Sequence, residues 1–121
     1  MEFVKKMSEL YQLSAGSMEL LMENMERISY SKKEIVIAEG QKDDFTYFVE
    51  KGSTRGYVYR DGKCCTLFFS FEGDSLTSVL GEAEQRNARF IVETLEDTDL
   101  LRISHTRMDL LFKESVELAN W

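Results

Sequence analysis

The alternation of apolar and polar residues divides the chain into helical ends and a central series of short strands. Between residues 1 and 28, apolar positions recur at the three- to four-residue spacing that predicts amphipathic helices. The second of these predicted helices opens near Ser14, with Ser17 as its expected N-cap. Its apolar stripe consists of Leu20, Leu21, Met25 and Ile28. The methionines of this segment are expected to fill gaps where the helix packs on a sheet.

From Ser29 onward the period changes, because β-branched and aromatic residues alternate with polar ones between turn signals. The predicted strands are Ile35–Ile37, Tyr47–Glu50, Arg55–Arg60, Lys63–Phe71, Phe90–Thr94 and Asp99–Ile103. They recur roughly every ten residues, a spacing that predicts an antiparallel sandwich or barrel of about eight short strands. In the longest strand, the run Leu67–Phe69 is too apolar to lie wholly on the surface.

Residues 72–89 form the least regular segment of the chain. Glycines and small polar residues predict a loop, with one turn of helix between Ser78 and Gln85. The segment begins at a glycine–acid pair, Gly73 and Asp74, which closes the preceding meander of strands. This turn is the first candidate for holding a ligand.

The last part of the chain returns to a helical pattern. Ser104 is the expected N-cap of one helix, and residues 115–121 read as the beginning of another. We therefore predict a mainly β protein with one β-roll domain over residues 29–104. Helical pieces at residues 1–28 and 105–121 flank this domain.

The length and composition of the chain limit its class. Its 121 residues are enough for one domain with a core but not for two. Hydrophobic residues make up 43% of the chain, which argues against disorder. No apolar run approaches the roughly 20 residues that span a bilayer, and the N-terminus lacks the apolar core of a signal peptide. We therefore expect a cytoplasmic protein without a membrane partner.

Acidic residues outnumber basic ones, so that the formal net charge is −7. A domain that binds DNA usually carries a basic face. The acidic balance therefore argues against direct contact between these residues and nucleic acid.

The two cysteines, Cys64 and Cys65, are adjacent, and His105 is the single histidine. A vicinal disulfide would be strained, so we expect two reduced thiols, which are too few for a zinc or iron–sulfur site. His105 stands at a predicted helix start, where it is expected to cap the helix or face solvent. Without a Ser-His-Asp or Cys-His set, we predict that the chain is not an enzyme.

Several short motifs together resemble the sensor domain of Crp/Fnr-type bacterial transcription regulators. The motifs are Lys33–Glu34, Glu39–Gln41, Tyr47–Gly52, Arg55–Gly56, Asp61–Lys63, Phe71–Asp74, Leu95–Thr98 and Ile103–Ser104. Their order and spacing carry the resemblance, which extends from about residue 10 to residue 121. The Arg-Gly pair and the Glu-Gly-Asp turn are similar to the Bacteroidetes branch of the family.

The resemblance implies a double-stranded β-helix, or jelly roll, of the cyclic nucleotide-binding domain type. It implies a small-molecule effector, a homodimer formed through a long C-terminal helix, and a helix-turn-helix domain that contacts DNA. This chain holds the roll and only the beginning of the long helix, so the DNA-binding domain is missing from it. We expect either a part of a longer regulator or a stand-alone sensor module.

In the family's cyclic nucleotide binders, backbone amides of a Gly-Glu-Leu turn hold the phosphate, and an Arg-Ser-Ala segment supplies an arginine. The residues that the resemblance places at this site are Gly73, Asp74, Ser75, Leu76, Arg86, Ala88, Arg89 and Phe90. Ala88 stands at the arginine's position and Arg89 one residue later, which on a strand is the opposite face. Phe90 replaces the small alanine and would enter the pocket if it points inward. Arg86 has the right parity but lies further back in the loop.

These departures leave three alternatives for the ligand. The roll binds a cyclic nucleotide such as cAMP, or it binds another small anion or metabolite in the same cavity, or it is a dimerisation scaffold without a ligand. For Arg89, the alternative to a ligand role is a solvated strand arginine that pairs with Glu93 or Asp74. No haem, iron–sulfur cluster or other metal cofactor is expected.

Overall fold

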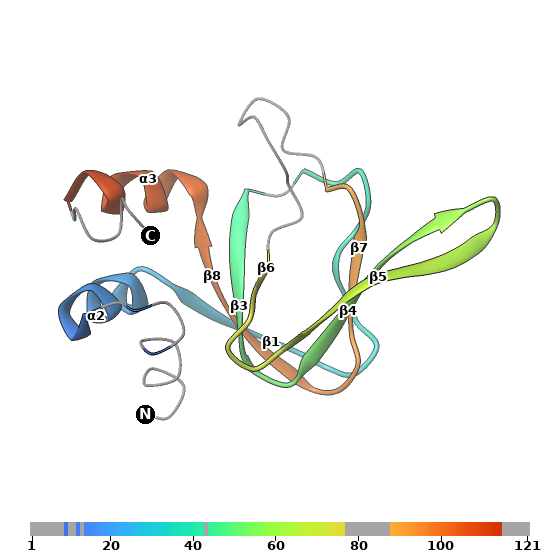
Figure 1. Cartoon of the computed structure of the whole chain (residues 1–121), viewed down its shortest axis with the longest axis horizontal. Helices are drawn as coiled ribbons and strands as arrows, with labels where there is room; N and C mark the ends of the chain where they lie inside the picture. Colours follow the sequence, from blue (N-terminus) through green and yellow to red (C-terminus); the bar gives the residue numbers. More distant parts are fainter. Residues whose placement is uncertain (1–8, 10–11, 13, 43, 77–87, 115–121) are drawn as a thin grey trace.

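The computed structural model describes residues 9, 12, 14–42, 44–76 and 88–114. Within these residues the chain forms eight strands between two helices (Figure 1). The helices are α2 (Ala15–Glu23) and α3 (His105–Glu114). The strands are β1 (Glu26–Tyr30), β2 (Ile35–Ile37), β3 (Phe45–Lys51), β4 (Ser53–Arg60), β5 (Lys63–Phe71), β6 (Ser75–Leu76), β7 (Ile91–Thr94) and β8 (Thr98–Ser104).

The strands make two four-stranded antiparallel sheets, with strand orders β1-β8-β3-β6 and β2-β7-β4-β5. Most successive strands cross from one sheet to the other, which winds the chain into a jelly roll. The predicted mainly β architecture with flanking helices is confirmed. Figure 1 shows α2 and α3 side by side along the β1-β8-β3 sheet, while the β4–β5 hairpin projects on the opposite side.

Two apolar cores lie on the two faces of the β1-β8-β3-β6 sheet. Alternation along β8 explains the division, because Leu100 and Leu101 are both buried but face opposite sides. Leu101 packs with the helices, in a cluster that includes Met18 and Leu111. Leu100 faces the second sheet, in the interior of the roll. The helices therefore cover one sheet face, and the roll closes over the other.

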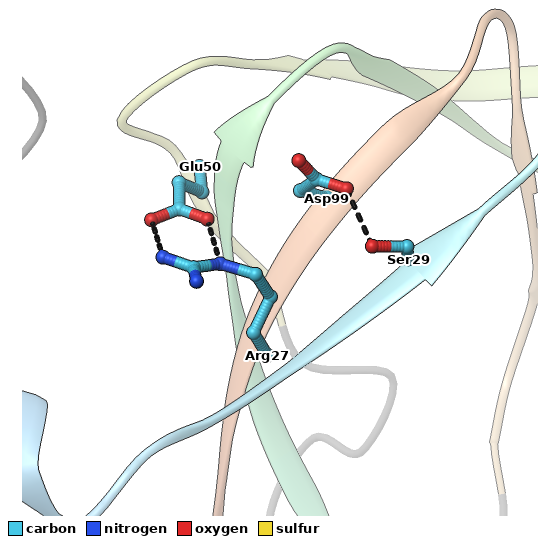
Figure 2. Close-up of polar contacts among 4 residues, drawn as sticks. All are labelled: Arg27, Ser29, Glu50 and Asp99. Carbon is cyan, nitrogen blue, oxygen red and sulfur yellow. Dashed lines mark hydrogen bonds and ion pairs between the residues drawn. The ribbon is translucent and has the colours of Figure 1, made fainter.

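Polar side chains tie the strands of the first sheet together on its helix side (Figure 2). Arg27 of β1 reaches across β8 to Glu50 of β3 and forms a two-pronged ion pair, in which Nη2 lies 2.6 Å from Oε2. The hydrogen bond to Glu50 and its charge raise the pKa of Arg27. The hydroxyl of Ser29 donates to Asp99 Oδ1 at 2.7 Å. These contacts join β1 to the sheet.

The predicted N-terminal helix ends earlier than expected. Helix α2 stops at Glu23, and β1 begins at Glu26, so Ile28 belongs to a strand and not to the helical stripe. Ile28 pairs with Leu100 of β8, and this long-range pairing overrides the local helical period. The expected cap is also wrong, because the hydroxyl of Ser14 accepts from the backbone N–H of Ser17 at 3.2 Å.

The apolar run of β5 is more exposed than its composition suggests. Phe68 is half-buried and points into the roll, whereas Leu67 is 50% and Phe69 53% exposed. A bulge opposite Gly56 and Tyr57 shifts the register of the pair. The prediction that the run does not lie wholly on the surface therefore holds for Phe68 alone.

The predicted cap at the C-terminal end is confirmed, because Ser104 Oγ accepts from the backbone N–H of Arg107 at 3.1 Å. The expected helical turn between Ser78 and Gln85 and the expected helix at residues 115–121 lie outside the described residues. None of the helices in the described part is long and apolar enough to cross a membrane.

Candidate functional site

The turn between β5 and β6 is held by its own side chain and by β3. Asp74 Oδ2 accepts from the backbone N–H of Phe71 at 2.8 Å, and the backbone N–H of Asp74 donates back to Phe71 at 2.9 Å. Gly73, at φ +92°, donates to the carbonyl of Val49 at 2.8 Å. Val49 in turn donates to the carbonyl of Asp74 at 2.9 Å. One oxygen of the Asp74 carboxylate is thus used to shape the turn.

The segment that leads into β7 is anchored to the β2–β3 loop. The backbone N–H of Ala88 donates to Gln41 at 2.8 Å, and the carbonyl of Ala88 accepts from Gly40 at 2.8 Å. Ala88 is buried, whereas Arg89 is exposed. The two residues therefore face opposite sides, as their adjacent positions in an extended segment require.

Arg89 forms no ion pair or hydrogen bond within the described residues. The expected pairing with Glu93 or Asp74 is not observed. Glu93 accepts from the Tyr57 hydroxyl at 2.8 Å, and Asp74 binds its own turn. The side chain of Arg89 is exposed on the surface.

Phe90 points into the roll. It is 8% exposed, and its ring meets the edge of Phe68 with centroids 5.0 Å apart and planes at 83°. Edge-to-face contact is a favoured arrangement of aromatic rings. The space that a small alanine would leave open is therefore filled by two aromatic side chains.

The structure brings together some of the expected site residues and separates others. Leu76, Ala88 and Phe90 meet in the interior of the roll. Asp74, Ser75 and Arg89 are exposed at its surface. Arg86 lies outside the described residues.

Groups that could hold a metal or act as nucleophiles are not gathered at this site. In the part of the chain that the structure describes, no three His, Cys, Asp or Glu side chains are grouped as metal ligands. Cys64 is exposed and Cys65 half-buried on the β4–β5 hairpin. The ring Nε2 of His105 lies 3.2 Å from the Thr46 hydroxyl, at the start of α3. These contacts explain His105 as a group that joins α3 to β3.

One buried polar network lies on the outer face of the second sheet. The guanidinium of Arg55 stacks on the ring of Tyr57 at 4.2 Å, and the hydroxyl of Tyr57 donates to Glu93. Burial and then the bond to Glu93 raise the pKa of Tyr57 to about 12. The phenol is thus neutral in the physiological pH range and unsuited to act as a base there.

The sequence did not reveal a cavity in the roll whose lining includes Arg102 of β8. Its residues come from four strands that are distant in sequence. A signal was present, because Arg102 is a charged residue between buried Leu101 and Ile103 in the middle of β8.

Comparisons with known proteins identify the fold and the family. The family model described as "Cyclic nucleotide-binding domain" matches residues 27–115. A comparison with curated proteins finds no match.

Solved structures that share the fold include three bacterial regulators. The catabolite activator protein of Thermus thermophilus superposes with a TM-score of 0.78 at 18% identity, over 95% of this chain and 53% of that protein. The N-terminal domain of a transcriptional regulator from Streptomyces coelicolor A3(2) gives 0.76 at 17% identity, over 89% of this chain and 76% of that one. The c-di-GMP-responsive global regulator CLP of Xanthomonas campestris gives 0.74 at 23% identity, over 83% and 49%. The chain thus spans about half the length of the two longer regulators.

Proposed function

The chain belongs to the cyclic nucleotide-binding domain family, and on that basis we propose that it is the effector-sensing domain of a Crp/Fnr-type transcription regulator. The observation that carries the proposal is the match of the family model over residues 27–115, which includes the whole described roll. Structural likeness to three transcription regulators supports the same assignment. The assignment to the Bacteroidetes branch stays a prediction.

The ligand of this domain is proposed to be a small anion held by the turn at Gly73–Leu76 and by an arginine that follows it. Backbone N–H groups at a turn and a guanidinium are general features of phosphate sites. The exposed residue Arg89 is one candidate for that arginine, and Arg86 is the other. A cyclic nucleotide is one candidate ligand, and the c-di-GMP response named for CLP makes a cyclic dinucleotide a second.

Two features favour a ligand other than cAMP. Phe90 and Phe68 occupy interior space, and one oxygen of the Asp74 carboxylate is engaged in its own turn. They also support a second candidate function, a dimerisation module that binds no effector. In both cases homodimer formation through the C-terminal helix stays a prediction, because residues 115–121 lie outside the described part.

DNA binding by the whole regulator is proposed to reside outside these residues. The chain has a net charge of −7, whereas nucleic acid requires a basic surface. The expected helix-turn-helix domain is therefore assigned to a longer protein of which this chain is the sensor. Ligand binding in the roll would then control dimer geometry and, through it, DNA binding.

Thermal unfolding with cAMP, cGMP and c-di-GMP tests the effector proposal. A ligand that binds only the folded state raises its stability by about 2.7 kcal/mol at one hundred times the dissociation constant. Arg86→Met and Arg89→Met should each be compared with Arg60→Met, whose arginine lies exposed at the tip of the β4–β5 hairpin. We expect one of the first two variants to lose the stabilisation and Arg60→Met to keep it.

The alternative function makes the opposite prediction. If none of these nucleotides shifts the unfolding temperature at millimolar concentration, the hypothesis that the domain binds a nucleotide effector is wrong. Analytical ultracentrifugation of a protein that includes the whole C-terminal helix would then have to show a stable dimer without any ligand. A monomer in that experiment would refute the scaffold function.

A further inference from the structure

A cavity of about 250 Å³ lies between the two sheets, next to the proposed effector site but lined by other residues. Its walls come from β1, β2, β3, β8 and the β2–β3 loop, and no residue of β6 or β7 lines it. Val36 and Ile37 form one apolar side, and Phe45 and Tyr47 form the other. These four side chains offer apolar and aromatic surface to a flat group.

Arg102 supplies a positive charge at the inner surface of this cavity. It shares a face of β8 with buried Leu100, because the two residues are two positions apart on the strand. Its guanidinium lies over the ring of Phe45 at 4.1 Å, and its Nε pairs with Glu26. The side chain of Arg102 is 26% exposed, so the charge is partly withdrawn from water.

The ion pair with Glu26 uses only one of the nitrogens of Arg102. The two terminal nitrogens have no hydrogen-bond partner among the described residues. A guanidinium presents its N–H groups as a planar fork that matches a carboxylate. Withdrawing a charge from water without full pairing is costly, so the open edge of Arg102 suits an anionic partner.

The rim of the cavity carries a second cation. Lys42 lies on the β2–β3 loop, and its ammonium is 3.9 Å from the carboxylate of Asp44, a distance at the limit of an ion pair. The chain as a whole is acidic, and Lys42 and Arg102 each face one carboxylate, from Asp44 and Glu26. The attraction for an anion therefore comes from the terminal N–H groups of Arg102. The pocket is also smaller than the roughly 300–1,000 Å³ of typical ligand sites, which limits the occupant to about one substituted ring.

We propose that this cavity binds a small aromatic carboxylate. The ring lies between the two apolar sides, and the carboxylate accepts hydrogen bonds from the terminal nitrogens of Arg102. None of Gly73–Leu76 lines this cavity, although Tyr47 of its wall pairs with Leu76. The proposal is argued from Arg102 and the apolar walls, and it does not rest on nucleotide binding at the turn.

Titration of the full chain with 4-hydroxybenzoate, followed by NMR, tests the site. We expect saturable binding with a Kd below about 1 mM. Two comparison probes separate the contributions, since 4-hydroxybenzamide keeps the ring without the charge and cyclohexanecarboxylate keeps the charge without the ring. Both should bind at least about tenfold more weakly, which corresponds to about 1.4 kcal/mol.

Matched variants locate the binding. Arg102→Met should weaken binding at least about tenfold, whereas Lys63→Met, at the exposed hairpin tip, should leave the Kd unchanged. If Arg102→Met does not fold, Val36→Trp tests the same point by filling the cavity from β2. Absence of saturation, equal binding of the uncharged amide, or unchanged binding in the folded cavity variant would each overturn the proposal. The thermal response to cyclic nucleotides is a separate measurement, so failure here leaves the effector proposal intact.

Discussion

Phe90 is the residue at which the stability of the roll and the shape of its interior are most directly linked. It stands where the resembled family has a small alanine, and its ring packs edge-to-face on Phe68 in the interior. The substitution Phe90→Ala removes this ring and leaves the surrounding β-sheets in place. It therefore measures how much of the fold depends on filling the space that a nucleotide would need.

The expected cost follows from burial. Phenylalanine-to-alanine changes in protein cores cost about 3–5 kcal/mol, because transfer free energy is lost and a cavity remains. Phe90 is 8% exposed, so we expect a value near the lower end, about 3 kcal/mol. Roughly 1 kcal/mol of that is the specific contact with Phe68. For a chain of this size the unfolding temperature should fall by about 10 °C.

Urea unfolding followed by circular dichroism gives the free energy of unfolding directly. Phe71→Ala is the matched control, because it removes the same side chain from a position that is 57% exposed. Its cost should stay below about 1 kcal/mol. Phe90→Leu provides a milder version, at about 1.5 kcal/mol or less, in case the alanine variant is not folded.

The reasoning about the roll interior is wrong if Phe90→Ala costs less than about 1 kcal/mol. It is equally wrong if Phe71→Ala is as destabilising as Phe90→Ala. Either result would mean that Phe90 does not fill the interior in solution, and the argument against a nucleotide-sized space would be lost.

Three further changes test other contacts. Gly52 has φ +103°, and a Cβ there would lie 2.5 Å from Thr98 Oγ1. Gly52→Ala should therefore lower the free energy of unfolding in urea by more than about 2 kcal/mol. A cost below about 0.5 kcal/mol would contradict this. Ser104→Ala should remove the cap of α3 and cost about 1 kcal/mol, and Ser104→Asp should keep most of it. The pKa of Tyr57 is about 12 in the folded protein and about 10 when unfolded, so its contribution is complete below pH 10 and is lost as pH rises to about 12. Urea midpoints measured across this pH range should fall less steeply for Tyr57→Phe than for the wild type, and equal slopes would show that burial and the bond to Glu93 do not raise the pKa of Tyr57.

Local pattern was sufficient for much of the fold. The bounds of β5 at Lys63 and Phe71 and the cap of α3 at Ser104 were predictable. Turn residues and alternating side chains act within a few positions of each other, so their effects are visible in the sequence. The motifs of the β3–β6 region likewise carry the resemblance to the family.

For the candidate site, the alternation of side chains along an extended segment was enough to predict that Ala88 and Arg89 face opposite sides. It did not decide whether Phe90 points inward, because that depends on Phe68, which reaches it from another strand. The use of the Asp74 carboxylate within its own turn was also hidden, since a carboxylate at that position can serve a ligand or the backbone equally well.

The amino-acid sequence by itself determined the strand periodicity, the turn positions, the acidic charge and the family of this protein. Tertiary structure alone decided where α2 gives way to β1, because Ile28 is held by pairing with Leu100 some seventy residues later. It also decided the surroundings of Arg102, whose cavity is assembled from four strands. Contacts between residues far apart in the chain depend on how the two sheets wind around each other. A local sequence pattern does not determine that winding.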